Sequence, residues 1–164
     1  MDMEKNWKLI KETFNQALES SSHCALATVN EDGSPHLTPI GSVILGKVGH
    51  GLYFEKFTTN MPNNFKHNKQ VCVLAVNSSK WLWIKAILLG RFSSPPAMRL
   101  VGKVGEPRAA TEREIKLWQK RVGGASWTKG YALMWSEMSM VRDIYFTQAK
   151  PIHIGKMTAN IVYQ

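Results

Sequence analysis

Apolar residues in the first part of the chain repeat with the period of a helix. Trp7, Ile10, Phe14 and Leu18 lie three or four positions apart, which places them on one stripe of a helix with 3.6 residues per turn. The stripe ends at the serines 20 to 22, residues that are typical of a helix end. The pattern therefore predicts an N-terminal amphipathic helix.

After the serines the pattern changes to that of strands. The run "CALATVN" is rich in small and β-branched residues, "EDGSP" has Asp-Gly turn chemistry, and "HLTPIGSVIL" returns. Together they predict a β-hairpin. A further turn and a third strand follow in "GHGLYFEKF". We expect these three strands to form a meander.

The second of these strands contains Pro39 at its centre and Gly41 two places later. Both residues weaken a hydrogen-bonded ladder. One interpretation is an ordinary edge strand. The other is a backbone that leaves the ladder, where its free N–H and C=O groups need partners such as the donors and acceptors of a heteroaromatic ring.

Helices and strands then alternate to the end of the chain. The segment "TTNMPNNFKHNKQ" predicts a short helix over about residues 61–67, because its first residues are N-cap types and Pro62 suits a first helical turn. The runs "VCVLAV", "KWLWIKAILLGRF" and "AMRLVGKVGEP" predict three strands, the last two joined by a Pro95-Pro96 turn. Thr111 and Glu114 form a capping box, and it opens a helix that carries Ile115, Trp118 and Val122 on one face.

The last strand or hairpin is predicted in "SMVRDIYFTQAKPIHIGKM", while the Gly-rich segment 123–138 has no readable pattern. Six or seven strands with flanking helices predict a mainly β fold, a closed antiparallel barrel. At 164 residues the chain suits one domain, residues 1–164. No apolar run approaches the about 20 residues of a membrane span, and the N-terminus lacks a signal-peptide pattern, so we expect a cytoplasmic protein without a membrane partner.

The net charge and the reactive side chains limit the functions that the sequence allows. The net charge of +9 favours an anionic partner, which could be nucleic acid, an acidic surface or a phosphate-bearing small molecule. Cys24 and Cys72 lie inside apolar runs, so we expect buried free thiols. The five histidines show no metal-ligand spacing, and we expect no metal site. Nucleophile-elbow, Rossmann and P-loop motifs are absent.

One segment could receive a phosphate. Thr58, Thr59 and Asn60 supply polar side chains before a helix start, and Lys56 and Lys66 supply charge. Plain N-capping is the alternative. The Pro-Gly break lies one hairpin upstream, so both segments could open at the same end of the barrel. A flat ring with a phosphate tail would suit both.

The order of these elements over residues 15–105 resembles the pyridoxamine 5′-phosphate oxidase-like FMN-binding split-barrel family. The resemblance is carried by "CALATVNEDGSPHLTPIGSVIL", "GLYFEKFTTNMPNNFKHNKQVCVLAV", "LLGRF" and "VGKV". It implies a six-stranded split barrel, usually a homodimer, with FMN at the subunit interface. It also implies that the flavin ring is lined by Thr38, Pro39, Ile40 and Ser42, and that the phosphate is held by Lys56, Thr58, Thr59 and Asn60.

The sequence departs from that family in two places. The Arg/Lys pair common at the start of the short helix falls on Asn60 and Met61, so another cation, from Lys56, Lys66, Arg91 or Lys103, would have to replace it. The C-terminal half also lacks the arginine-rich substrate segment of true pyridoxamine phosphate oxidases, so we do not expect vitamin B6 oxidation.

The leading hypothesis is an FMN-binding homodimer that acts as a small oxidoreductase with NAD(P)H or another small redox substrate. Alternatives are a non-catalytic flavin or haem protein on the same fold, and a basic barrel that binds nucleic acid through strands such as "KWLWIK". No residue is assigned as catalytic, although His36 and Ser42 are candidates by position.

The sequence also predicts where the aromatic side chains and the methionines lie. Trp127, Tyr131 and Trp135 are expected near the ring, with Trp127 or Tyr131 closing over the cofactor. Burial in the core or in a dimer interface is expected for Trp7, Trp81, Trp83 and Trp118. Burial in the core is expected for Met134, Met138, Met140 and Met157.

Overall fold

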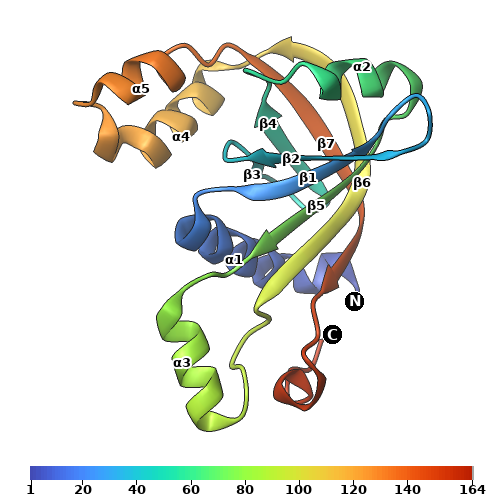
Figure 1. The fold of residues 1–164 in the computed structure, drawn as a ribbon, viewed down its shortest axis with the longest axis vertical. Coiled ribbons are helices and arrows are strands. Elements are labelled where there is room, and N and C mark those ends of the chain that lie inside the picture. Colours follow the sequence, from blue (N-terminus) through green and yellow to red (C-terminus); the bar gives the residue numbers. More distant parts are fainter. Residues whose placement is uncertain (164) are drawn as a thin grey trace.

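A computed structural model describes residues 1–163 of the chain (Figure 1). Its strands are β1 Cys24–Val29, β2 Pro35–Ile40, β3 Ile44–Leu45, β4 His50–Phe54, β5 Gln70–Val76, β6 Ala97–Ala109 and β7 Met140–Pro151. Its helices are α1 Met3–Ser21, α2 Asn60–His67, α3 Lys80–Leu89, α4 Glu112–Val122 and α5 Lys129–Met134, with 3-10 turns at Gly123–Ala125 and Gly155–Thr158. None of these helices is long and apolar enough to cross a membrane.

The strands form one antiparallel sheet in the order β2-β1-β5-β6-β7-β4-β3. The two edge strands, β2 and β3, are consecutive in the chain and are separated only by residues 41–43. The predicted second strand is therefore broken in two: its first half pairs with β1, and its second half pairs with β4. Counted as one strand, the two halves give the predicted six-stranded split barrel.

The predicted three-stranded meander is confirmed only in part, because its middle strand is broken. β4 does not pair with β2 but with β7 and with the short β3. Pro39 and Gly41 mark the place where the chain leaves one ladder and joins another, so the second half of the strand cannot stay beside β1.

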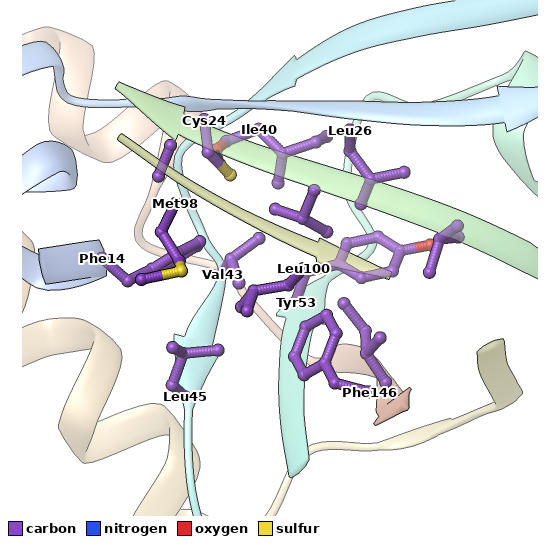
Figure 2. Close-up of a cluster of buried hydrophobic side chains, with 14 of the residues drawn as sticks. Phe14, Cys24, Leu26, Ile40, Val43, Leu45, Tyr53, Met98, Leu100 and Phe146 are labelled. Atoms are coloured by element: carbon purple, nitrogen blue, oxygen red, sulfur yellow. Dashed lines mark hydrogen bonds between the residues drawn. The ribbon is translucent and has the colours of Figure 1, made fainter. Parts of the chain in front are cut away.

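The helix α1 packs on the barrel through the predicted stripe. Trp7, Ile10, Phe14 and Leu18 are all buried, and α1 contacts β5 and β6. Figure 2 shows Phe14 close to Met98, in a core whose side chains come from most strands of the barrel. The apolar stripe therefore fixes where the N-terminal helix lies on the sheet.

The segment after β5 is a helix, and the strand predicted there is wrong. The β5 strand ends at Val76, and Asn77 then accepts a hydrogen bond from the Ser79 amide at 3.0 Å through its side chain. The Trp83 indole N–H donates to the Asn77 carbonyl at 2.8 Å, and Gly90 ends the helix with a φ of 66°. Trp83 is half-buried against Phe92, whereas Trp81 is exposed.

The helix α4 begins at the predicted capping box, in which Thr111 and Glu114 exchange hydrogen bonds with each other's backbone. Trp118 is buried, as predicted. Among the methionines expected in the core, Met138 is buried and Met157 half-buried, but Met134 and Met140 are exposed. Both cysteines are free; Cys24 is buried and Cys72 is half-buried.

Gly102 provides a test of the packing between β6 and β7. It lies at a register shift between the two strands, and a Cβ there would stand 2.2 Å from the Tyr145 carbonyl oxygen. We expect Gly102→Ala to lower the free energy of unfolding by about 2–3 kcal/mol, measured by urea denaturation. Gly124→Ala, where a Cβ meets nothing within 4 Å, should change it by about 0.5 kcal/mol or less. Equal stabilities of the two variants would contradict this close approach.

Candidate cofactor site at the split of the barrel

The break between β2 and β3 leaves backbone carbonyls without strand partners, and side chains supply them. The Arg121 guanidinium of α4 donates from Nη1 to the Val43 carbonyl at 2.6 Å and to the Gly41 carbonyl at 3.4 Å. The Cys24 thiol donates to the Ile40 carbonyl at 3.2 Å. Burial raises the pKa of Cys24 to about 12, so this thiol stays protonated and remains a donor.

Ser42 ties the break to β4. Its hydroxyl donates to the Phe54 carbonyl at 3.2 Å and accepts from the Phe54 amide at 3.1 Å, and the residue is buried. Because both hydrogen-bonding functions are used, the hydroxyl positions the backbone of the break. The broken strand is thus held by the protein itself at several points.

A pocket of about 220 Å³ opens beside the break. Two walls come from the segments in which site residues were predicted, and the third comes from α4, α5 and the residues before β7. The lining residues are Thr38, Pro39, Ile40, Gly41 and Ser42, then Phe54, Lys56, Phe57 and Thr58, and finally Trp118, Met134, Trp135 and Met138. Of the eight predicted site residues, all but Thr59 and Asn60 therefore line one pocket.

The connection from β4 to α2 contains a buried polar group without a hydrogen-bond partner. The Thr58 hydroxyl is buried and has no hydrogen-bond partner, although a buried hydroxyl normally has one. The buried hydroxyls of Thr13, Tyr53 and Tyr163 also lack partners, but none of these residues lines the pocket. Thr58 therefore combines a free buried hydroxyl with a place in the pocket wall.

The start of α2 is also left without a side-chain cap. Thr59 is the N-cap residue, but its side chain makes no capping hydrogen bond, which departs from the plain N-capping interpretation. The backbone N–H groups at a helix start favour an anion. Phe57, just before it, has a φ of 64°, an uncommon conformation for a non-glycine residue. An exposed aromatic side chain is held there beside Lys56, whose ammonium lies 5.1 Å from the ring centroid.

The predicted cations lie in different parts of the fold. Lys56 lines the pocket. Lys66 donates to Asn63 on the exposed side of α2, Arg91 lines a separate cavity beside α3, and Lys103 is exposed on β6. Of these four residues, only Lys56 can contact a ligand in the pocket.

Aromatic side chains from α4 and α5 close the pocket. Trp118 contacts Phe54 and Trp135, with ring centroids 5.8 and 6.4 Å apart, and Tyr131 packs edge-on against Trp135. Trp135 lines the pocket, but Trp127 is exposed and does not. Sequence reasoning missed Trp118, Met134 and Met138 as pocket residues. Helical periodicity shows that Trp118 faces inward but not which cavity it meets, and both methionines lie in the segment 123–138, which has no readable pattern.

The histidines lie outside the pocket lining. His36 is hydrogen-bonded to a lining residue, because its Nε2 lies 2.8 Å from the Thr38 hydroxyl. No cluster of three or more His, Cys, Asp or Glu side chains within residues 1–163 could hold a metal ion.

An ion-pair network holds α4 over the pocket. The Arg108 guanidinium on β6 donates to Glu114 at the start of α4 and to Asp143 on β7, each at 2.7 Å. Hydrogen bonds from Arg108 hold the pKa of Glu114 at about 2. The network fixes the first turn of the helix that carries both Trp118 and Arg121.

The chain matches the family model of pyridoxamine 5′-phosphate oxidase over residues 10–143. It therefore belongs to the pyridoxamine 5′-phosphate oxidase family, as the resemblance implied. No curated protein matches the chain.

Solved structures show the same fold. HupZ from Group A Streptococcus is 16% identical, with 88% of this chain and 92% of that chain covered and a TM-score of 0.57. An FMN-binding protein from Syntrophomonas wolfei is 10% identical, with 91% and 89% covered and a TM-score of 0.62. The haem storage protein HutZ from Vibrio cholerae is 12% identical, with 87% and 94% covered and a TM-score of 0.54. The fold is thus shared by an FMN-binding protein and a haem storage protein.

Arg121→Met tests whether the guanidinium holds the break. The change leaves the Val43 and Gly41 carbonyls without this donor, so we expect the free energy of unfolding to fall by about 1–3 kcal/mol in chemical denaturation. Lys120→Met removes the same charge from the neighbouring exposed residue and should cost less than about 0.5 kcal/mol. Similar losses in both variants would indicate a general charge effect instead.

The pKa of Glu114 predicts how the anchor of α4 responds to acid. Because this pKa is lowered to about 2 from its ordinary 4.5, the network stabilises the fold above about pH 4.5 and is lost as the pH falls toward 2. Glu114→Gln should therefore lower the urea midpoint at pH 7 and make the midpoint fall less between pH 4.5 and 2.5 than in the wild type. Parallel pH profiles would contradict this role.

Proposed function

We propose that the chain binds FMN in the pocket at the split of the barrel and acts as a small flavin-dependent oxidoreductase. The observation that carries the proposal is the junction of two separate segments, 38–42 and 56–58, around one pocket that holds the free hydroxyl of Thr58. An apolar cavity with a few polar groups at one end is the common form of a cofactor site.

Each wall of the pocket would take a different part of the cofactor. The backbone from Thr38 to Ser42 would run along the flavin ring. Lys56, the Thr58 hydroxyl and the N–H groups at the start of α2 would hold the phosphate. Trp118, Trp135 and Met138 would cover the ring and exclude water.

Bound FMN would supply the transfer of electrons or hydride, and the protein would supply orientation and electrostatics. The guanidinium of Arg121 lies behind the carbonyls of the break, and Lys56 lies at the pocket wall. These positive charges favour an anionic form of the reduced ring. Ser42 is committed to Phe54, so we assign it a positioning role and no proton transfer.

Haem is the second candidate, because the haem storage protein HutZ has this fold. Haem iron in proteins is held by His, Cys, Met or Tyr side chains. Histidine, cysteine and tyrosine are missing from the described pocket lining, where Met134 and Met138 are the only such ligands. The residues of the pocket therefore favour FMN. Nucleic-acid binding loses the support of the aromatic strand, since "KWLWIK" lies in the helix α3.

A homodimer is part of the proposal. The pocket of about 220 Å³ lies below the roughly 300–1,000 Å³ of typical ligand sites, and its mouth is bordered by the exposed Phe57. A second subunit would enlarge and cover it. NAD(P)H or a small-molecule acceptor would then exchange electrons with the ring.

The absorption spectrum of the purified protein tests the choice of cofactor. We expect a yellow protein that releases FMN on denaturation, or a colourless one that becomes yellow on reconstitution with FMN. A Soret band would show that the bound cofactor is haem and not flavin. Failure to bind either cofactor would overturn the proposal.

Thr58→Val tests the phosphate end of the site. The variant removes the free hydroxyl and keeps the shape of the side chain, so it should weaken FMN binding about 10-fold or more, because a hydrogen bond to a charged group contributes about 1.5–3 kcal/mol. Stability without FMN should not fall, since the hydroxyl has no protein partner. Thr59→Val is the matched control and should change FMN affinity less than about threefold. Unaltered affinity in Thr58→Val would count against the assignment.

A further inference from the structure

The helix α3 presents large apolar side chains to solvent. Trp81, Ile84 and Leu88 lie three and four positions apart, which places them on one side of the helix, opposite to its only buried residue, Ala86. Trp81 is 79% and Leu88 80% exposed, and Ile87 is exposed beside them. We call Trp81, Ile84, Ile87 and Leu88 the α3 stripe. Apolar side chains that are exposed as a group mark an interaction surface.

The fold holds α3 beside the C-terminal segment at one end of the molecule. Phe92, just after the helix, is fully buried. Its amide donates to the Met157 carbonyl at 2.7 Å, and its carbonyl accepts from the Asn160 side-chain amide at 2.9 Å. Figure 1 shows α3 and the C-terminal segment at the lower end of the long axis, and α4 and α5 at the upper end. We call residues 77–99 and 150–163 the α3 end.

All charged side chains of the α3 end are positive. The sequence has no Asp or Glu in either of its ranges, and its exposed cations are Lys80, Lys85, Arg91, Arg99, Lys150 and Lys156. Lys80 and Lys85 flank the α3 stripe on the helix. Arg99 lies directly opposite Lys150 in the ladder of β6 and β7, and like charges in that position destabilise a sheet. An anionic partner would offset this repulsion. Glu19, at the neighbouring end of α1, lines the cavity between α1 and α4 instead.

An apolar stripe between cations fits the surface of a membrane that contains anionic lipid. Helices of this kind lie in the plane of the interface, where their apolar side chains enter the boundary between headgroups and acyl chains. Lysine side chains reach from there to the headgroups, and each cation near an anionic leaflet adds to the binding. Nucleic acid would match the charge but leave Ile84, Ile87 and Leu88 uncovered. Two copies joined through α3 would cover the stripe but bring the cations together, which costs free energy.

The structure changes the expectation of no membrane partner. That expectation depended on the length of a membrane span, whereas a helix in the interface does not cross the bilayer. It also treated "KWLWIK" as part of a strand, in which alternate side chains would be buried. In the helix α3, Trp81 and Ile84 are exposed on the same side.

We propose that α3 docks the protein on the surface of a membrane that contains anionic phospholipid. The α3 stripe enters the headgroup region, and the cations of the α3 end contact the lipid phosphates. The docked protein directs α4 and α5, which border the pocket, away from the lipid, because they lie at the opposite end of the molecule (Figure 1). This inference goes beyond the proposed function and does not depend on FMN.

Co-sedimentation with lipid vesicles tests the docking. We expect the wild-type protein to bind vesicles of equimolar phosphatidylcholine and phosphatidylserine, and to bind vesicles of phosphatidylcholine alone about 10-fold or more weakly. Added NaCl should weaken the binding, because salt screens the anionic surface.

Leu88→Glu tests the α3 stripe. The variant places a charge at the centre of the stripe, so its partition onto the mixed vesicles should fall about 10-fold or more. The fold should tolerate the change at this exposed position, which circular dichroism checks. Leu133→Glu is the matched control, because Leu133 is a 76% exposed leucine on α5, at the other end of the molecule. It should bind vesicles like the wild type.

Lys85→Gln tests the contribution of charge. Loss of one cation near an anionic surface should weaken the partition about fivefold. Lys116→Gln removes the same charge from an exposed position on α4 and should leave the partition unchanged.

Several results would overturn the proposal. One is wild-type protein that does not sediment with the mixed vesicles, and another is an equal loss of binding in Leu88→Glu and Leu133→Glu. Equal binding to both kinds of vesicle would exclude recognition of anionic lipid. A wild-type dimer that binds no vesicles and that Leu88→Glu splits, as seen by sedimentation velocity, would make a second copy the partner of α3. Titration of Leu88→Glu with FMN should give the wild-type affinity, so the result for the membrane is separate from that for the proposed function.

Discussion

One strand has to serve both edges of the barrel, and most of the structure around the pocket follows from this constraint. The chain leaves β1 at Ile40 and joins β4 at Ile44, so the carbonyls between them lose the ladder. Arg121 reaches two of them from α4. That helix must in turn be fixed to the barrel, which Arg108 does by holding Glu114 and Asp143 together. The helix brings Trp118 over the pocket as a result.

Because of the same constraint, polar groups with hydrogen-bond partners in the protein lie on one side of the pocket, and polar groups without such partners lie on the other. Around the break, the thiol of Cys24, the hydroxyl of Ser42 and the guanidinium of Arg121 all have backbone partners. On the opposite wall, the Thr58 hydroxyl has none, and the start of α2 has no side-chain cap. Groups that stabilise the fold therefore lie on one side of the pocket, and groups available to an anionic ligand lie on the other. This division is what the proposed flavin site depends on.

Local chemistry in the sequence was enough to predict several elements. The stripe of α1, the Asp-Gly turn after β1 and the capping box of α4 each depend on residues close together in the chain, and all three are present. The helix α3 was misjudged because its apolar residues occur on all sides and so carry no period. The pairing of β3 with β4, and the choice of Thr58 over Thr59 as the pocket hydroxyl, depend on contacts and orientations that spacing alone does not specify. Trp118 was correctly placed in the interior, but its role as a pocket wall required the position of α4.

Cys24 stands at the edge of this arrangement, donating to a carbonyl of a residue that lines the pocket. Reactions of cysteine with oxidants proceed through the thiolate. A thiol whose pKa is about 12 has almost no thiolate at neutral pH, and it is also screened from solvent by burial. Next to the proposed flavin, this sulfur atom would therefore stay outside the oxidation series from sulfenic to sulfonic acid. The burial that keeps Cys24 protonated as a donor to Ile40 therefore also protects its sulfur from oxidation beside the proposed cofactor site.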